Sequence, residues 1–269
     1  MSGPVPALVL AGSRRGEADA VARAAGVPHR ALAPVGGRAM LARVLDALAA
    51  EPRIDGVLVS TDRPDLLAAH PDIAPLLEGG RVRLLESRES LSASVLDALE
   101  RTGLPLLVTT ADHALLDSRT LARFLDGAER ADGDLAFAVV PRSLFLRRFP
   151  GSRRTWWRFR EDGYSGANLF LLRGAAARRM VERWRRIERE RKRPWRIVVA
   201  LGPHLLLAYL LRRLTLARAV AALSRRLGVE IRPVVLDVPE AAVDVDRPED
   251  LRLAESVLAA RSAAPQGAA

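Results

Sequence analysis

One aspartate of this sequence stands where it could do chemistry on a charged ligand. Asp112 follows the apolar run 104–109, so its carboxylate is expected at the carboxyl end of a buried strand. A carboxylate in that position suits Mg²⁺, because this cation prefers oxygen ligands. An aspartate here could also cap the next helix, but Asp117 or Ser118 would fit that use better, since the helix is expected to begin near Ser118. Asp112 is therefore a candidate metal ligand.

A glycine-containing turn with two arginines follows the first apolar run of the chain. Residues 6–11 predict a buried strand, and Gly12, Ser13, Arg14 and Arg15 come directly after it. Backbone N–H groups exposed in such a turn can hold a polyphosphate, and adjacent guanidinium groups add positive charge. Ordinary turn chemistry between a strand and a helix is the alternative for this segment. On its own, the turn leaves both interpretations open.

Alternating strands and helices would position both segments. Buried strands are predicted at 6–11, 56–61, 82–86 and 104–109, and helices between them at 39–50, 64–69 and 92–101. This order predicts βαβ units, and hence an α/β fold with a Rossmann-like, mostly parallel sheet flanked by helices. Ligands of such sheets bind at the carboxyl ends of the strands, where Gly12 and Asp112 are expected.

The second half of the chain is less regular and strongly basic. Its predicted elements are strands at 135–141, 167–172 and 230–237, and helices at 175–191, in the apolar stretch 197–211, and at 214–227 and 248–260. Between residues 178 and 226 there are fifteen Arg or Lys and three Glu, a net charge of +12. The whole chain carries +10, so the remainder is close to neutral at −2. We interpret 1–260 as one domain with a basic helical insertion at about 174–228, and 261–269 as a disordered tail.

Composition excludes several classes of site. The chain has 269 residues and no cysteine, which rules out disulfides, thiolate metal sites and a cysteine nucleophile. Its four histidines argue against a histidine-rich metal site. The first residues lack a signal-peptide pattern, and the longest nearly apolar stretch, 197–211, is too short to span a bilayer. We therefore expect a cytoplasmic protein.

The segment from His29 to Leu41 connects these features with a known family. It reads His-Arg-Ala-Leu-Ala-Pro-Val-Gly-Gly-Arg-Ala-Met-Leu, with a basic residue before a Pro-Val-Gly-Gly turn and a helix start. Here the sequence resembles the nucleotidyltransferase superfamily that includes the MobA-like molybdenum-cofactor guanylyltransferases and the sugar- and alcohol-phosphate nucleotidylyltransferases. Arg30 stands where that family has a phosphate-contacting lysine, and Ala39 replaces its usual proline. The resemblance implies a fold of the nucleotide-diphospho-sugar transferase type.

Two further segments carry the resemblance into the metal site. Residues 110–116, Thr-Ala-Asp-His-Ala-Leu-Leu, are similar to the family element whose aspartate holds Mg²⁺, which implies this role for Asp112. Residues 242–251, Ala-Val-Asp-Val-Asp-Arg-Pro-Glu-Asp-Leu, resemble the closing element in which a carboxylate or amide completes the site. Asp246 is the closest match, and the alternation with valine predicts Asp244 on the same strand face. Either aspartate could instead cap the following helix.

The resemblance also implies a set of ligand-contacting residues. The nucleotide-binding candidates are Leu10, Ala11, Gly12, Ser13, Arg14, Arg30 and Ser94, and the acceptor-binding candidates are Gly166 and Asn168. Ser94 could instead cap a helix, and Asn168 could serve only the local backbone. The loop after the first strand departs from the family's Gly-Gly-x-Ser/Gly-x-Arg pattern, so the resemblance does not decide which of Arg14 and Arg15 faces phosphate.

These roles together predict a nucleotidyltransferase. An acceptor phosphate attacks the α-phosphorus of an NTP, with GTP or CTP favoured, and pyrophosphate leaves. Mg²⁺ is the expected cofactor, and Arg14, Arg30 and Asp112 are the catalytic candidates. The alternatives are a glycosyltransferase of the related fold and a basic module without catalysis.

The expected partners are an NTP and a phosphorylated small-molecule or lipid-linked acceptor, and no nucleic acid is expected. We also hypothesise that 174–228 makes peripheral contact with an anionic membrane, at its inner face. An ordinary helical subdomain or a dimer interface are the alternatives for this segment, and the oligomeric state is open.

Overall fold

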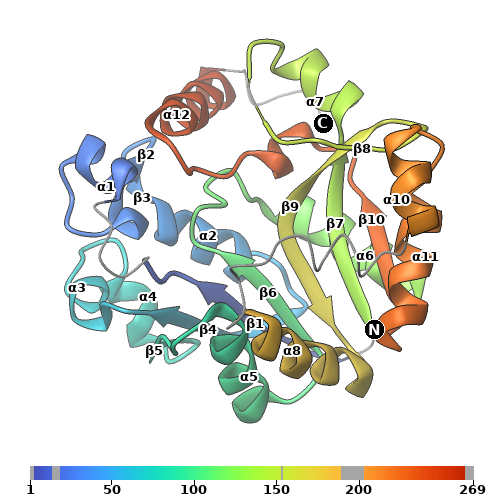
Figure 1. Cartoon of the computed structure of the whole chain (residues 1–269). Coiled ribbons are helices and arrows are strands. Elements are labelled where there is room, and N and C mark those ends of the chain that lie inside the picture. Colours follow the sequence, from blue (N-terminus) through green and yellow to red (C-terminus); the bar gives the residue numbers. More distant parts are fainter. Residues whose placement is uncertain (1–2, 14–18, 153, 189–202, 264–269) are drawn as a thin grey trace.

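The computed structural model describes residues 3–13, 19–152, 154–188 and 203–263. Within these ranges, eight strands form one sheet in the order β10-β7-β9-β6-β1-β4-β5, with β8 paired to β9 (Figure 1). The strands are β1 (Val5–Leu10), β4 (Ile54–Thr61), β5 (Val82–Glu86), β6 (Leu106–Thr110), β7 (Leu135–Pro141), β8 (Trp157–Arg158), β9 (Gly163–Leu172) and β10 (Ile231–Val235). β9 runs antiparallel to its neighbours, and the other pairs along the order are parallel. The predicted mostly parallel sheet is confirmed.

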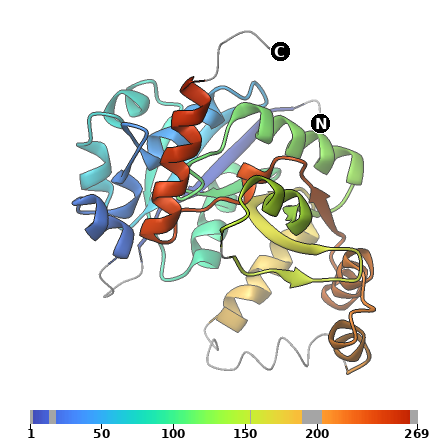
Figure 2. The same cartoon turned by 90° about the horizontal axis from the view of Figure 1, so that it is seen from above.

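Helices cover both faces of this sheet (Figures 1 and 2). They are α1 (Ala20–Ala25), α2 (Met40–Ala49), α3 (Pro64–Ala68), α4 (Ala74–Glu78), α5 (Leu91–Thr102), α6 (Ser118–Ala131), α7 (Arg142–Arg148), α8 (Ala175–Glu188), α10 (Pro203–Leu210), α11 (Leu216–Leu227) and α12 (Pro248–Ala263). Successive side chains of β1 face opposite sides, so Ala7 and Val9 join the core under α2 and α6, whereas Leu8 joins the core under α5 and α8. Burial on both faces explains why the strands read as continuous apolar runs.

Short polar side chains set the helix starts around the carboxyl ends of the strands. Asp117 caps α6 by accepting a hydrogen bond from the main-chain N–H of Thr120 at 2.8 Å, as predicted. Asp19 caps α1 in the same way. A small hairpin of β2 (Pro34–Val35) and β3 (Arg38–Ala39) precedes α2, and Gly36 and Gly37 turn it with positive φ angles. The Pro-Val-Gly-Gly element is thus a tight turn that leads into a helix.

The segment 243–247 is not a strand, so the predicted shared strand face of Asp244 and Asp246 is wrong. A short 3₁₀ helix, η2 (Pro239–Ala242), precedes it. The main-chain N–H of Val245 then donates to the main-chain oxygen of Asp112 at 3.0 Å. Because this single bond replaces a strand ladder, the segment closes over the end of β6 without joining the sheet.

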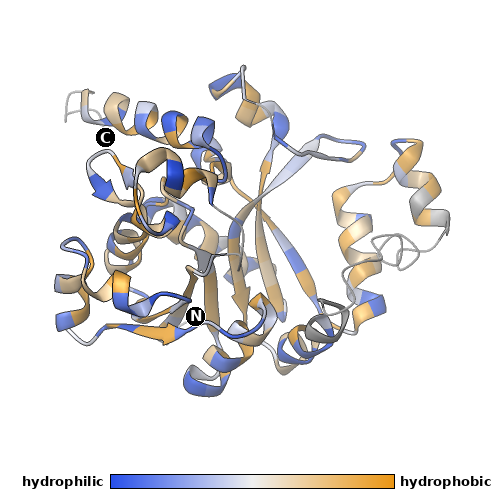
Figure 3. Cartoon of the chain, turned by 60° about the vertical axis from the view of Figure 1, so that its left-hand side comes forward, coloured by the Kyte–Doolittle hydropathy of each residue, from blue (hydrophilic) through white to orange (hydrophobic). Residues whose placement is uncertain are grey.

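Three helices are described in the basic region 174–228. α8 packs on the sheet through Ala177 and Val181, and α11 does so through Val220 beside β10. α10 stands with α11 at one side of the molecule (Figures 1 and 3). Residues 189–202, including the end of the predicted helix 175–191, lie outside the described residues. Within the described part, no helix has both the length and the apolar character needed to cross a membrane.

The C-terminal helix is longer than predicted. α12 continues to Ala263, three residues into the segment that we expected to be a disordered tail. Arg261 explains part of this extension, since its Nη1 lies 3.5 Å from Oδ2 of Asp117 and so ties the last turn to the start of α6. Residues 264–269 lie outside the described residues.

Candidate active site

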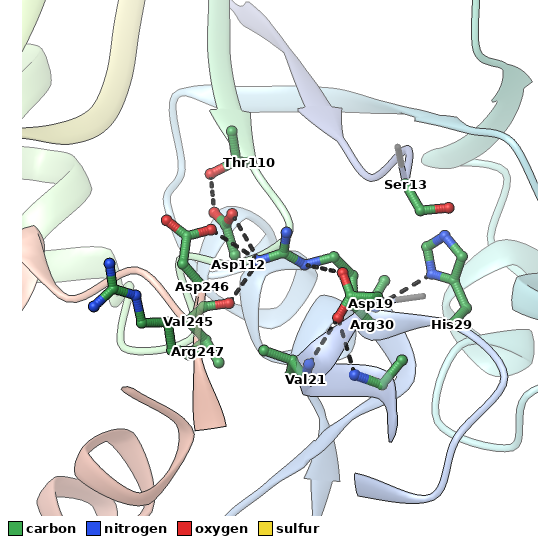
Figure 4. Close-up of polar contacts among 12 residues, drawn as sticks. Ser13, Asp19, Val21, His29, Arg30, Thr110, Asp112, Val245, Asp246 and Arg247 are labelled. Carbon is green, nitrogen blue, oxygen red and sulfur yellow. Dashed lines mark hydrogen bonds and ion pairs between the residues drawn. The ribbon is translucent and has the colours of Figure 1, made fainter. Parts of the chain in front are cut away.

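The guanidinium group of Arg30 is the centre of a charge cluster at the carboxyl end of β6 (Figure 4). Its Nη2 lies 3.3 Å from Oδ2 of Asp112 and 3.1 Å from Oδ1 of Asp246. The same nitrogen donates a hydrogen bond to the main-chain oxygen of Val245 at 2.6 Å. Its Nε lies 3.6 Å from Oδ2 of Asp19. One arginine thus joins the cap of α1, the end of β6 and the segment before α12.

Asp112 is partly withdrawn from water, with 18% of its side chain exposed. Burial raises the pKa of its carboxyl group, and the neighbouring charge of Asp246 acts in the same direction. A hydrogen bond from Oγ1 of Thr110 and the charge of Arg30 oppose this rise. The hydrogen bond from Thr110 and the positive charge of Arg30 are therefore what favour its ionised form.

The loop that carries Arg30 is fixed by His29. The Nδ1 of this buried ring accepts a hydrogen bond from the main-chain N–H of Ala31 at 3.2 Å, which caps the 3₁₀ helix η1 (Arg30–Leu32). Because Nδ1 acts as an acceptor, Nε2 carries the hydrogen. It donates that hydrogen to Oδ1 of Asp62 at 3.2 Å. The Arg30 loop is thus connected to the end of β4.

Asp62 also fastens the turn after β1. The main-chain N–H of Ser13 donates to Oδ1 of Asp62 at 2.9 Å, and Oγ of Ser13 donates to Oδ2 at 2.6 Å. Burial tends to raise the pKa of Asp62, but the hydrogen bonds from Ser13 and His29 outweigh it and hold the pKa below its usual value. An ionised Asp62 therefore holds two loops together, and Figure 4 shows Ser13 and His29 on the same side of Arg30.

The remaining nucleotide-binding candidates lie at or near this turn. Leu10 ends β1, and buried Ala11 and exposed Gly12 follow it. A Cβ atom built on Gly12 would lie 3.7 Å from Ser87, so the turn approaches the end of β5. Ser94 is buried, and its Oγ accepts a hydrogen bond from the main-chain N–H of Arg88 at 3.0 Å. Arg14 and Arg15 lie outside the described residues.

A second arginine, Arg154, was missed by sequence reasoning. Only 11% of its side chain is exposed, and it forms an ion pair with Asp244. Its guanidinium carbon lies 5.5 Å from the centre of the Phe145 ring. Burial lowers the pKa of Arg154, and the charges of Asp250, Asp246 and Asp112 counteract this effect. Nothing in the spacing of the arginines between β7 and β8 distinguishes this one in the sequence.

Asp62 was missed as well, although a signal for it exists. It follows the apolar strand β4 as Asp112 follows β6, so the strand-end criterion that selected Asp112 would also have selected Asp62.

Asp112 and Asp246 both contact Nη2 of Arg30, so their carboxylates line one position for a cation, here called the shared cation position. Within the described residues, no group of three or more His, Cys, Asp or Glu side chains is placed to hold a metal ion. Mg²⁺ is commonly held by one or two carboxylates, with substrate phosphates and water completing its shell. This pair therefore fits an ion that arrives with a polyphosphate. Asp244 faces Arg154 instead, so the two aspartates have different partners.

The acceptor-binding candidates lie on β9, beside the carboxyl end of β7. Gly166 is exposed and pairs with Val139. Asn168 is half-buried and has a φ of 48°, and it lies where the register between β7 and β9 shifts. Amide side chains tolerate this left-handed conformation better than most. The conformation of Asn168 fits a local backbone role at this irregularity, and acceptor binding by Gly166 and Asn168 stays a prediction.

Comparison with known structures supports the architecture. A hypothetical transferase from Thermus thermophilus is 35% identical, with a TM-score of 0.76, over 92% of this chain and 99% of that one. The 2-C-methyl-D-erythritol 4-phosphate cytidylyltransferase from the same species is 21% identical, with a TM-score of 0.56, over 94% and 98% of the two chains. A CMP:2-keto-3-deoxy-manno-octonic acid synthetase in complex with CTP is 13% identical, with a TM-score of 0.57, over 97% and 100%. The last two share the fold.

The sequence itself assigns the family. No curated protein matches the chain. The model of the MobA-like NTP transferase domain matches residues 7–201, which run from within β1 to beyond β9 and include the Arg30 loop and Asp112. The protein is thus a nucleotidyltransferase that belongs to the MobA-like NTP transferase family.

Proposed function

We propose that the protein transfers a nucleoside monophosphate from an NTP to a phosphorylated acceptor and releases pyrophosphate. The observation that carries this proposal is the cation position shared by Asp112 and Asp246, occupied here by the guanidinium of Arg30. It lies on the same side of the sheet as the turn that Asp62 fastens after β1. A polyphosphate and a divalent cation would meet between these two features.

The proposed reaction depends on positioning the two substrates and neutralising their phosphate charge, and it needs no side-chain base. An oxygen of the acceptor phosphate forms a bond to the α-phosphorus, and the bond from that phosphorus to the bridging oxygen breaks, with the electron pair leaving on pyrophosphate. An ionised phosphate is already a nucleophile, so no side-chain base is required. The main-chain N–H of Ser13 already donates to Asp62 and so is not free to bind phosphate. Among the described residues, Arg30 is therefore the group placed to offset the negative charge of the triphosphate.

Asp112 and Asp246 would hold Mg²⁺. When bound, this ion neutralises developing charge on the α-phosphate. Arg30 already balances both carboxylates, so it would have to move toward the phosphates as the ion enters. Arg154 stays as a second positive charge beside Asp244 and keeps that carboxylate out of the metal site.

CTP and GTP are the proposed donors. The names of the cytidylyltransferase and of the synthetase solved with CTP favour cytidine. The acceptor is proposed to be a phosphorylated alcohol or sugar, free or linked to lipid, since one of these relatives is named for a phosphorylated polyol. Contact of the basic region with an anionic membrane is a separate proposal, which does not depend on the reaction and is argued from its residues below.

Thermal unfolding with each of the four NTPs and Mg²⁺ is the first test. A nucleotide at 100 times its Kd should stabilise the fold by about 2.7 kcal/mol. The stabilising NTP should then give pyrophosphate release with a panel of phosphorylated alcohols, and Asp112→Asn should slow that release on the order of 10²–10³-fold. Stabilisation by nucleotide sugars but by no NTP would assign a glycosyltransferase. No response to any nucleotide would leave the non-catalytic alternative.

A further inference from the structure

Four large apolar side chains gather on two neighbouring segments beside the sheet. The exposed fractions are 62% for Trp157, 56% for Leu207, 67% for Leu210 and 55% for Leu211. These are half of the large hydrophobic residues that are exposed in the described part of the chain. Figure 3 shows that α10 lies at one side of the molecule. We call Trp157, Leu207, Leu210 and Leu211 the apolar patch.

The leucines of the patch face outward because the opposite side of α10 is already used. Residues 207, 210 and 211 have helical spacing, and the N–H of Leu211 donates to the oxygen of Leu207 at 2.9 Å, so they lie on one face. Tyr209 packs the other way. Its ring meets Phe159 edge to face at 6.0 Å, and its hydroxyl accepts a hydrogen bond from the N–H of Arg158 at 3.4 Å.

The patch is fixed to the hairpin formed by β8 and β9. The N–H of Arg160 donates to the oxygen of Leu214 at 2.9 Å, and the N–H of Leu216 donates to Oε1 of Glu161 at 2.8 Å. Leu214 itself is buried. This hairpin leads into β9 at the carboxyl end of β7, the edge of the sheet where the proposed site lies. The patch therefore has a defined orientation relative to that site.

Unpaired positive charge lies next to the patch. Arg158, Arg160, Arg212 and Arg213 are exposed, and none of them forms an ion pair with another described residue. Arg158 ends β8, Arg160 lies in the turn that follows it, and Arg212 and Arg213 follow Leu211 directly. Apolar side chains beside several arginines, with a tryptophan among them, are typical of a surface that rests in the interface of an anionic membrane.

A second copy of the chain fits this surface less well. A stable dimer buries roughly 800 Å² on each partner, which is more than four partly exposed side chains supply. A two-fold contact would also place the four arginines of one copy near those of the other, where like charges repel. A nucleic acid would use the arginines but would leave the outward-facing leucines in water.

We propose that the apolar patch and its four arginines dock the protein on an anionic lipid bilayer. Trp157, Leu207, Leu210 and Leu211 enter the headgroup region, and the arginines bind lipid phosphates around them. The edge of the sheet that carries the proposed site then lies close to the membrane surface, within reach of a lipid-linked acceptor. Docking itself does not depend on the proposed reaction, and only the orientation toward the acceptor rests on it.

Sedimentation of the full chain with vesicles tests this proposal. Vesicles of phosphatidylcholine with phosphatidylglycerol should bind the protein, those of phosphatidylcholine alone should not, and binding should weaken from low to physiological salt. Arg212→Gln with Arg213→Gln should lower the partition coefficient about 25-fold, since each arginine near anionic lipid contributes about fivefold. Leu207→Ser with Leu210→Ser should abolish binding at physiological salt.

Two control variants separate this site from general surface properties. Arg225→Gln with Arg226→Gln makes the same change of charge at exposed positions in the last turn of α11. Val235→Ser removes an exposed apolar side chain from β10. Both should bind vesicles as the wild type does, and all variants should keep its unfolding temperature and its stabilisation by NTP.

Three results would overturn the proposal. They are equal loss in the test and control variants, no binding to anionic vesicles at low salt, and a dimer in sedimentation equilibrium that Leu207→Ser with Leu210→Ser dissociates. The last result would assign the patch to a second copy. Because stabilisation by NTP is measured on the same proteins, failure of docking is distinguishable from failure of the proposed transfer reaction.

Discussion

Arg30 and Asp112 are 82 positions apart in the sequence, and Nη2 of Arg30 lies 3.3 Å from Oδ2 of Asp112. The same nitrogen lies 3.1 Å from Oδ1 of Asp246. A side-chain cation therefore occupies the position between two carboxylates that the proposed function gives to Mg²⁺. Two cations cannot share this position, so Arg30 and a divalent ion should compete for it.

Arg30→Ala should tighten the binding of Mn²⁺, used as a probe for Mg²⁺, when no nucleotide is present. The expected gain is about tenfold, because like charges a few ångströms apart repel by about 1 kcal/mol or more even in water. Electron paramagnetic resonance of free Mn²⁺ measures it directly. The same variant should weaken NTP use, and Arg30→Lys should keep part of it. Arg38→Ala, which removes an arginine paired with Asp46, is the control. Unchanged or weaker Mn²⁺ binding in Arg30→Ala would exclude the competition.

Asp112→Asn should lower kcat by on the order of 10²–10³, as loss of a preorganised electrostatic group commonly does. The fold should survive, since burial raises the pKa of this carboxyl and so disfavours its charged form. An isosteric amide removes that desolvated charge without leaving a cavity. Steady-state kinetics and thermal unfolding measure both effects. Asp132→Asn, at a side chain that is 95% exposed, should change neither. Near-normal turnover of folded Asp112→Asn at saturating Mg²⁺ would remove Asp112 from the site.

Asp246→Asn and Asp244→Asn should behave differently. Asp246 shares Arg30 with Asp112, whereas Asp244 pairs with Arg154. We expect Asp246→Asn to weaken Mn²⁺–NTP binding by about tenfold or more and Asp244→Asn to leave it within about twofold, since only Asp246 lies at the shared cation position. Isothermal titration calorimetry with each variant provides the comparison. If Asp244→Asn weakened binding as much as Asp246→Asn, both aspartates would belong to the metal site.

Asp62→Asn should raise KM for the NTP more than it lowers kcat, because Asp62 positions Ser13 and His29 and does not touch the reacting atoms. Hydrogen bonds to a charged group contribute about 1.5–3 kcal/mol, so kcat/KM should fall by about tenfold or more. Ser13→Ala alone should have a smaller effect. The double variant should be less affected than the two single effects combined, since both remove the same hydrogen bond. Fully additive effects would show that Asp62 acts through another contact.

His113 should make the fold sensitive to mild acid. Its ring is 1% exposed, and burial lowers its pKa from 6.5 to about 4, an effect that the nearby charge of Asp117 only partly offsets. Below pH 6.5 His113 binds a proton in the unfolded chain but not in the folded chain. The free energy of unfolding should therefore fall between about pH 6.5 and 4. The full loss is about 3 kcal/mol on the usual conversion from pKa to free energy. Denaturant unfolding of wild type and His113→Gln at pH 7 and pH 5 measures it, and the variant should lose less stability. Equal losses would place the titrating group elsewhere.

The sheet could be predicted from the sequence because its strands are buried on both faces. A run such as 6–11 is apolar throughout, as is typical of a central strand in a layered α/β fold, and its side chains are buried on both faces of the sheet. The segment around Asp244 and Asp246 could not be predicted in this way. Alternation with valine is typical of a strand, but a strand also needs a neighbour with free main-chain groups. Among the described residues, the main-chain N–H of Val245 donates to the oxygen of Asp112 and its oxygen accepts from the side chain of Arg30, so no strand pairs with this segment.

The site residues that come directly after a strand could be predicted from the sequence, whereas those on a long connecting loop could not. Asp112 was selected by its position after β6, and the same criterion extends to Asp62 after β4. Arg154 reaches the carboxylates because Phe145 and Asp244 hold its guanidinium. Those contacts depend on how the connection between β7 and β8 packs on the rest of the chain, and neighbouring sequence positions do not encode that packing.

The contact of Val245 with both Arg30 and Asp112 also has a consequence for biosynthesis. Arg30 donates to the main-chain oxygen of Val245, and Val245 donates to the main-chain oxygen of Asp112. A ribosome makes the Arg30 loop and β6 long before it reaches residue 245. A nascent chain that already contains β1 to β9 therefore carries Asp19, Arg30 and Asp112, three of the four charges of the cluster, without the segment that closes over them. The cluster that the proposed function needs is therefore completed only after residues 245 and 246 have left the ribosomal exit tunnel.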